Sequence, residues 1–349
     1  MKLDPASNAL LLSNRAAIER MAMDRAKGGD RAKATVLPPA LPGERFVVDG
    51  VNCYVSGNGP PLLLVHRVNA VSSAAEMRPV FQHCMAGRTV FALDLPGFGL
   101  SDRSDRPYTP RLMTDAVLAV ASEIRRRCGN VPIDALAVAL GCEFLARAAV
   151  ERPSVWGRLA LVSPTGLAGT HARRGPTGST YLMPWMHAAL SVKLWADPFY
   201  RALTKPGVVR YFLQRTWGTK AIDETLLAYG VRTARQPGAR FAPLCLLSGE
   251  LFSADIHRIY ERLAQPVWMS HGVLGDFTDF RSHTIVAARA NWKFTVFASG
   301  AMPYFQVPDD FFYVADAFLL GLPVPTGSEN PTPTHRTRPD DVLAHPLHR

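Results

Sequence analysis

The chain has 349 residues, 48% of them hydrophobic, a composition typical of a globular protein with one large domain or one domain plus an insertion. No apolar run approaches the roughly 20 residues of a membrane-spanning helix. The formal net charge is +10, but the arginines form neither a long run nor a patch interleaved with aromatic residues, so we expect a solvated basic surface and no nucleic-acid site.

The five cysteines are odd in number, far apart and without a C-x-x-C pair. This spacing argues against a disulfide framework or a zinc site and favours a reducing compartment, so we expect a cytoplasmic protein. Nothing in the sequence implies a metal or an organic cofactor, and the oligomeric state cannot be inferred from it.

The two ends of the chain differ from its middle. Residues 1–42 are expected to form a leader and linker, with an amphipathic helix over 7–27 and no signal peptide. This basic leader offers a contact for a membrane surface or another protein. Residues 323–349 are proline-rich and polar, and we expect them to be disordered.

Between the ends, short apolar runs alternate with helical patterns. The stretch 45–57 predicts a hairpin that turns at Asp49-Gly50. Continuous apolar runs, too short for helices, then predict strands buried on both faces of a sheet at 61–66, 88–94, 133–138, 158–163, 266–271 and 293–298. Helices are expected near 74–86, 111–128, 140–152, 281–290 and 308–320. This alternation predicts a mostly parallel, doubly wound α/β sheet.

One interval lacks this alternation. About a hundred residues between Val162 and Pro266 are rich in aromatic side chains and show helical spacing. We predict that 166–250 form a helical cap, inserted after the sixth strand and lying over the carboxyl edge of the sheet, where open α/β sheets bind ligands. The core is then 43–165 together with 251–322.

Three motifs carry a resemblance to a known family. The run D-L-P-G-F-G-L-S at 94–101 is similar to the D-x-P-G-x-G-x-S segment of the α/β-hydrolase superfamily, and residues 62–79 resemble the loop after that fold's third strand. The segment 159–167 resembles the strand that leads into the cap. The resemblance covers most of 44–322. An unrelated dehydrogenase is disfavoured, because no G-x-G-x-x-G follows the first strand.

The resemblance implies a nucleophile in G-x-S-x-G, on a strained turn between a strand and a helix. Here the five residues are Ala137-Val138-Ala139-Leu140-Gly141. Small residues still flank the turn, but an alanine methyl cannot attack a carbonyl carbon. Acyl-enzyme chemistry is therefore excluded at Ala139.

The other two members of the implied triad are also in question. Asp276, with Asp279 as an alternative, follows the next-to-last strand, where the acid is expected. In the loop after the last strand, where the base is expected, Tyr304 stands in the region of the histidine, and a phenol is a poor general base at neutral pH. His66, His271 and His283 are expected to be structural.

The resemblance also implies an oxyanion site built from the loop His66-Arg67-Val68-Asn69 and from Leu140. Arg67 stands where the superfamily favours glycine. Its guanidinium either binds an anion at the mouth of the site or points into water.

Three hypotheses follow from departures at positions 67, 139 and 304, which are too many for a single engineered substitution. The first, which we favour, is a pseudohydrolase that binds a small apolar or aromatic ligand or a protein partner. The second is an enzyme that uses the same pocket for elimination, isomerisation or addition. The third is an ester or acyl hydrolase with its nucleophile elsewhere, for which Cys142, on the first turn of the following helix, is the candidate.

Overall fold

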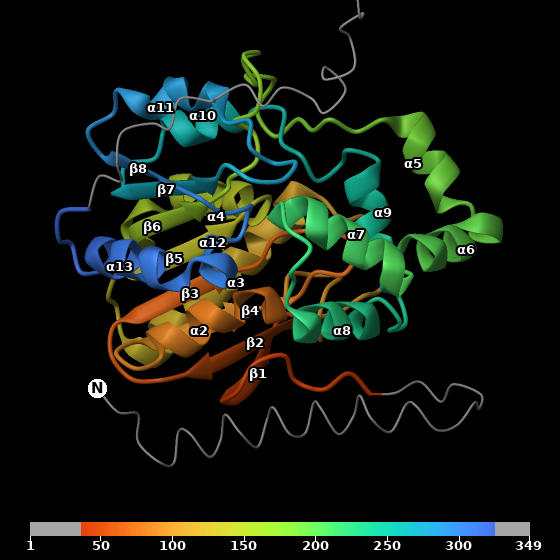
Figure 1. Ribbon diagram of the computed structural model, residues 1–349, viewed down its shortest axis with the longest axis horizontal. Coiled ribbons are helices and arrows are strands. Elements are labelled where there is room, and N and C mark those ends of the chain that lie inside the picture. The colour runs from red at the N-terminus through yellow and green to blue at the C-terminus, as the bar shows by residue number, and fades with distance from the viewer. Residues whose placement is uncertain (1–35, 325–349) are drawn as a thin grey trace, which may run out of the picture.

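The computed structural model describes residues 36–324 (Figure 1). The helix expected at 7–27, and the tail beyond residue 324, lie outside the described residues.

An eight-stranded sheet forms the centre of the molecule, with the strand order β1-β2-β4-β3-β5-β6-β7-β8. The hairpin β1–β2 is antiparallel, β2 pairs antiparallel with β4, and β4 through β8 run parallel. The strands are β1 Glu44–Val48, β2 Val51–Ser56, β3 Pro61–Val65, β4 Thr89–Leu93, β5 Ile133–Val138, β6 Trp156–Val162, β7 Val267–Gly272 and β8 Trp292–Phe297. The predicted mostly parallel α/β sheet is confirmed.

Alternation along the strands explains why the apolar runs are continuous. In β3, Leu63 and Val65 enter one apolar cluster, whereas Leu62 and Leu64 enter a second cluster on the opposite face. Because helices cover both faces, every residue of β3 is buried.

Helices cover the two faces of this sheet (Figure 1). The first cluster contains residues of α3, α4 and α10, and the second contains residues of α2, α12 and α13. Their bounds are α2 Arg78–Cys84, α3 Pro110–Cys128, α4 Gly141–Glu151, α10 Ile256–Glu261, α12 Pro303–Gln306 and α13 Pro308–Leu319. Short helices η2 (Ala74–Met77), η3 (Pro153–Val155), η4 (Arg281–His283) and α11 (Thr284–Ala287) complete the core.

The interval between β6 and β7 contains a group of helices that lies beside the sheet (Figure 1). They are α5 Pro184–Ser191, α6 Lys193–Leu203, α7 Pro206–Trp217, α8 Glu224–Thr233 and α9 Phe241–Leu247, and we call them the helical insertion. The insertion contacts the loop after β3: the Tyr200 hydroxyl donates to the Ala70 carbonyl at 2.8 Å. Arg78 at the start of α2 pairs with Asp223 before α8 at 2.6 Å.

Candidate functional site

The strand–turn–helix at Ala139 keeps the shape of a nucleophile elbow. Ala139 joins β5 to α4 with φ +49°, in the left-handed region that costs a non-glycine residue about 1–2 kcal/mol. Its N–H donates to Val162 O at 2.9 Å, and its carbonyl accepts from Cys142 N at 3.1 Å. A Cβ on Gly141 would lie 2.5 Å from His66 O, so α4 approaches the loop after β3 closely. The turn therefore persists with a partly buried methyl group at its tip.

Both ring nitrogens of His66 are hydrogen-bonded to backbone groups. Its Nδ1 donates to Arg67 O at 2.5 Å, and its Nε2 accepts from Leu95 N at 2.9 Å. Burial lowers the pKa of this imidazole below its ordinary value, which favours the neutral ring that this bonding requires. His66 therefore joins the β3 and β4 loops and has no ring nitrogen left to act as a base.

Arg67 is buried and paired, so the alternative in which it points into water is wrong. Its Nε donates to Glu76 Oε1 at 2.8 Å, and only 8% of the residue is exposed. Asn69 Nδ2 and Ser72 Oγ contact the same oxygen at 3.1 and 3.3 Å. The adjoining Val68 is also buried.

Glu76, which sequence reasoning did not single out, organises this loop. The only signal for it was a capping-box spacing, Ser73-x-x-Glu76 at the start of η2. In the structure the carboxylate turns to Arg67 instead of the helix start. Its Oε1 accepts the hydrogen bonds from Arg67, Asn69 and Ser72, whereas its buried Oε2 has no hydrogen-bond partner among the described residues.

Tyr304, at the start of α12, is buried to 1% exposure, and its hydroxyl has no hydrogen-bond partner among the described residues. Its ring packs against Phe305 and Phe311, with centroids 5.3 and 5.4 Å away. Burial, followed by the negative charge of Glu76, raises the pKa of this phenol well above its ordinary value. Tyr304 is therefore a neutral group that can donate a proton or a hydrogen bond and cannot accept a proton as a phenolate.

The two candidate acids are bound by arginines. Asp276 lies in the loop after β7, and Arg215 of α7 binds both of its oxygens, with Nη2 at 2.8 Å from Oδ1. Asp279 accepts from Arg281 and from Gly169 N, at 2.9 Å in the latter case, and these bonds lower the pKa of its carboxyl far below its ordinary value. Neither carboxylate has a hydrogen bond to a histidine in the described part of the chain.

Cys142 does not have the environment of a nucleophile. It is fully buried, and its thiol points at Val162 O at 3.7 Å. Burial raises the pKa of the thiol well above its ordinary value, which disfavours the reactive thiolate. A helix N-terminus can lower the pKa of a thiol, but at Cys142 the effect of burial is dominant and the thiol stays protonated.

A serine hydroxyl also meets a histidine ring within the insertion, where Ser248 Oγ lies 3.3 Å from His187 Nδ1. Ser248 is completely buried, and its hydroxyl donates to Cys245 O at 2.9 Å. This contact closes the end of α9 and leaves no route for a substrate to the oxygen.

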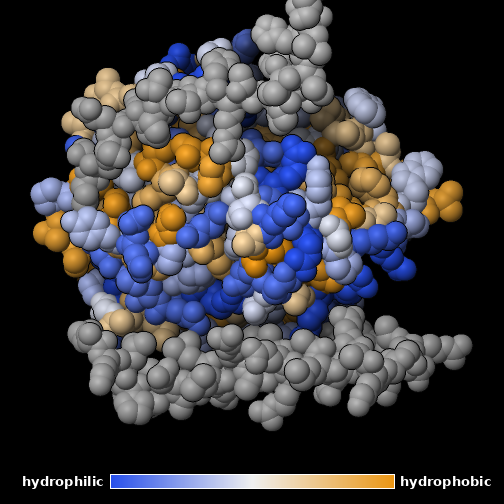
Figure 2. Space-filling view, in the orientation of Figure 1, coloured by the Kyte–Doolittle hydropathy of each residue, from blue (hydrophilic) through white to orange (hydrophobic). Residues whose placement is uncertain are grey.

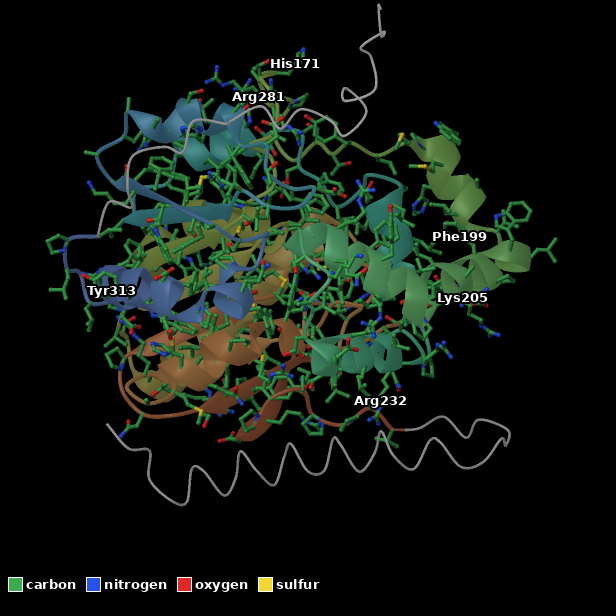
Figure 3. All side chains as sticks on the ribbon, viewed as in Figure 1. His171, Phe199, Lys205, Arg232, Arg281 and Tyr313 are labelled. Carbon is green, nitrogen blue, oxygen red and sulfur yellow. The ribbon has the colours of Figure 1, made fainter. Side chains whose placement is uncertain are left out.

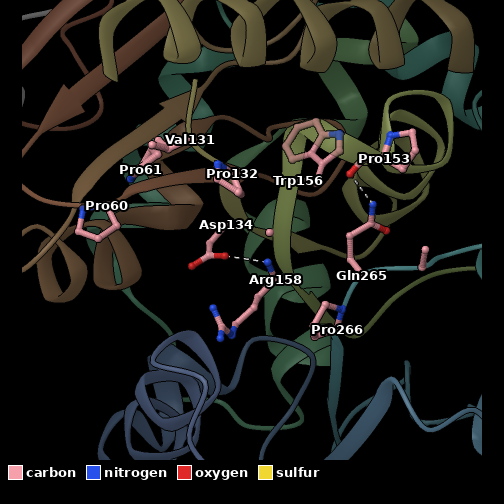
Figure 4. A pocket seen from close by; sticks show the side chains of 12 residues that line it. Pro60, Pro61, Val131, Pro132, Asp134, Pro153, Trp156, Arg158, Gln265 and Pro266 are labelled. Atoms are coloured by element: carbon pink, nitrogen blue, oxygen red, sulfur yellow. Dashed lines mark hydrogen bonds between the residues drawn. The ribbon is translucent and has the colours of Figure 1, made fainter. Parts of the chain in front are cut away.

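A cavity of about 750 Å³ lies at the amino ends of the strands, whereas Ala139 follows the carboxyl end of β5. Figure 4 shows the side chains that line this cavity. It is lined by the starts of β3, β5 and β6, including Pro61, Asp134 and Trp156. Asp134 accepts from Arg158 N at 2.7 Å and from Arg88 Nη1 at 2.9 Å. The amino ends of the strands are the edge where α/β sheets do not usually bind their ligands. Within residues 36–324, no group of three or more His, Cys, Asp or Glu side chains is placed to hold a metal ion.

Comparisons with solved structures define the class of fold. The chain is similar to a serine hydrolase involved in carbazole degradation (CarC), with a TM-score of 0.62 and 13% identity over 79% of this chain and 98% of that one. It is also similar to a bacterial membrane phospholipase A (TM-score 0.60, 17% identity, 90% and 92% coverage). A meta-cleavage product hydrolase from Pseudomonas fluorescens IP01 (CumD) gives a TM-score of 0.60 at 18% identity, over 80% and 98% of the two chains. The chain has the α/β-hydrolase fold.

Sequence comparison covers less of the chain. No protein-family model matches the chain. A curated relative, the uncharacterized hydrolase YugF of Bacillus subtilis (strain 168), is 28% identical over an alignment of 204 residues that covers 54% of this chain. The match spans 65% of that relative's length, just under two thirds.

Proposed function

We propose that this chain is a pseudohydrolase, which uses the α/β-hydrolase scaffold to bind a small apolar or aromatic ligand and does not form an acyl-enzyme. The observation that carries the proposal is Ala139 at the tip of a fully formed elbow. The strained turn is present, but the atom that would attack is absent, and the neighbouring thiol of Cys142 is buried and hydrogen-bonded.

The helical insertion acts as a cap in this proposal. Trp217 of α7 packs against Phe305 of α12, with ring centroids 5.1 Å apart, and Gly230 of α8 lies against Val71 in the loop after β3. These contacts hold the insertion against α12 and against the loop after β3. One of the similar structures is named for carbazole degradation, which supports an aromatic ligand.

Labelling with a fluorophosphonate probe tests the absence of a nucleophile. The native chain should take up no label, whereas it should bind 2-naphthyl acetate, an uncharged aromatic ester, without releasing naphthol. Stoichiometric labelling or sustained naphthol release would refute the proposal.

Titration of the native chain with a disulfide reagent tests the accessibility of the thiols. It should modify the partly exposed Cys128 and spare the buried Cys142.

Rebuilding the triad tests the site more directly. The variant Ala139→Ser/Tyr304→His supplies a nucleophile and a base, but Asp276 remains bound to Arg215. Adding Arg215→Ala frees that carboxylate. We expect the triple variant to hydrolyse esters faster than the double variant, by up to about 10⁴-fold if Asp276 then orients the new histidine. Adding Asp276→Asn to the triple variant is the matched control and should return the rate to that of the double variant.

A second candidate function rests on two buried oxygens. Within the described residues, neither Glu76 Oε2 nor Tyr304 Oη has a hydrogen-bond partner, and the negative charge of Glu76 contributes to the raised pKa of Tyr304. A carboxylate that accepts a proton and a phenol that donates one can together support isomerisation, elimination or addition. In that case Tyr304→Phe and Glu76→Gln each abolish conversion with ligand binding retained, whereas Asp276→Asn, at the arginine-bound carboxylate, changes neither.

A further inference from the structure

The first two helices of the insertion and the three residues before them expose many large apolar side chains. Helix α5 buries none of its residues. Across 181–199, eight large apolar side chains are at least 38% exposed, among them Trp185 at 71% and Leu194 at 80%. We call this set the aromatic tip; it consists of Tyr181, Leu182, Met183, Trp185, Val192, Leu194, Trp195 and Phe199. Single exposed apolar residues are ordinary, but a contiguous group of this size marks an interaction surface.

The tip lies at one end of the molecule. In Figure 1 helices α5 and α6 form the end farthest from β8 and α13, and Figure 2 shows apolar surface at that same right-hand end. Helix α6 is amphipathic: Ala196 and Tyr200 face inward and are buried, whereas Trp195 and Phe199, four residues apart, face outward. The outward face therefore has no partner in the described part of the chain.

Positive charges outnumber negative ones in this part of the insertion. Residues 181–222 contain six lysines and arginines and one acid, Asp197, although Arg210 and Arg215 of the six are paired with Glu224 and Asp276. The Asp197 carboxylate is already paired with Arg240 at 2.7 Å. Arg201 and Lys205, on either side of the end of α6, are exposed and have no carboxylate within ion-pair distance in residues 36–324. Figure 3 labels Phe199 and Lys205 at this end of the molecule.

We propose that the aromatic tip docks on a membrane surface that contains anionic phospholipid. Tryptophan, leucine and phenylalanine side chains enter the boundary between headgroups and acyl chains, and Arg201 and Lys205 meet the lipid phosphates. A second copy of the chain fits this face less well, because a twofold contact brings the same unpaired cations together. The described helices do not include one long and apolar enough to cross a bilayer, so this contact is with the surface.

The distribution of tryptophans makes the docking directly measurable. The chain has six tryptophans, and of these Trp185 and Trp195 are exposed and belong to the tip, whereas Trp156, Trp217, Trp268 and Trp292 are at most 4% exposed. Quenching of fluorescence by brominated lipid therefore reports contact of the tip with the bilayer. With the full chain, vesicles of equimolar phosphatidylcholine and phosphatidylglycerol should shift the emission to the blue, and brominated acyl chains should quench it.

Matched variants separate the tip from the rest of the surface. We expect Trp185→Ser/Leu194→Ser/Trp195→Ser to lower partitioning onto these vesicles, measured by co-sedimentation, at least tenfold. The control is Tyr313→Ser on α13, an aromatic side chain that is 70% exposed at the opposite end of the molecule (Figure 3), and it should bind like the unmodified chain.

The charge variant Arg201→Gln/Lys205→Gln should reduce binding to the anionic vesicles by about tenfold or more and leave the weak binding to pure phosphatidylcholine unchanged. The exposed Lys293→Gln on β8 is its control. Vesicle binding that survives the triple variant would place the contact elsewhere, for instance in the leader, and would overturn the proposal. A dimer that forms without vesicles and is abolished by the triple variant would overturn it as well, in favour of self-association.

Discussion

Replacing Asp94, the first residue of the D-L-P-G-F-G-L-S run, should be among the most damaging single changes in the core. Its carboxylate is fully buried and accepts four hydrogen bonds. Oδ1 accepts from Ala74 N at 2.7 Å, and Oδ2 accepts from Leu100 N and Asn52 Nδ2, both at 2.9 Å, and from Tyr54 OH at 3.3 Å. The group thus joins three segments: β2, the turn after β4, and the start of η2 beside the candidate site.

The loss of stability in an Asp94 variant follows from the hydrogen-bond donors that lose their acceptor. Asp94→Ala leaves four buried donors without a partner, at about 1–3 kcal/mol each, and relieves several kcal/mol of carboxylate desolvation. We therefore expect a net loss of about 4 kcal/mol in the free energy of unfolding, which is exceptional for one substitution. In Asp94→Asn the amide oxygen can accept the hydrogen bonds that Oδ2 accepts, but the amide NH₂ then faces the N–H of Ala74, and two donors cannot bond to each other. The expected loss in the free energy of unfolding is therefore about 1–3 kcal/mol.

Urea unfolding, followed by far-ultraviolet circular dichroism, measures both losses. Asp102→Asn, at an exposed carboxylate in the same loop, is the control and should change the unfolding free energy by less than about 0.5 kcal/mol. A loss below about 1 kcal/mol for Asp94→Ala would refute the reasoning, because the four donors would then have found other partners.

Three further predictions concern stability. Arg147 and Asp255 form a buried ion pair at 2.7 Å, so Asp255→Ala should cost about 3–5 kcal/mol in urea unfolding, whereas Arg147→Met/Asp255→Leu should cost far less; equal costs would contradict this account. Gly141→Ala places a Cβ 2.5 Å from His66 O and should lower the free energy of unfolding by about 1–3 kcal/mol. The control is Gly207→Ala in α7, where the added Cβ would meet no neighbouring group within 4 Å, and it should raise the free energy of unfolding by about 0.5–1 kcal/mol. Burial lowers the pKa of His66 in the folded chain, so below about pH 6.5 the unfolded chain binds more protons than the folded chain. The free energy of unfolding should therefore fall as the pH falls through that value, by up to about 1.4 kcal/mol per pH unit. His66→Asn should reduce that pH slope, and an unchanged slope would show that other groups produce it.

The strands and the core helices were predictable because burial imposes a local pattern. Runs such as 61–66 and 133–138 are apolar at most positions because helices cover both faces of the sheet and bury every residue of the two strands, and both strands fall within two residues of the expected bounds. The turn at Asp49-Gly50 was predictable because both residues adopt positive φ, which their residue types favour. The helix expected at 281–290 is shorter and begins as a 3₁₀ turn, since its sequence has no strong start signal.

The sequence by itself also determined which atoms exist at the elbow: position 139 carries a methyl group, and no arrangement of the chain can change that. Only the tertiary structure decided what the other site residues do. Arg67 is held by a carboxylate nine residues further along the chain, Asp276 is held by a guanidinium from the insertion, and the Tyr304 hydroxyl has no hydrogen-bond partner within residues 36–324. Such pairings depend on distances between segments far apart in the chain, and a side chain's role follows from the charge that folding places beside it.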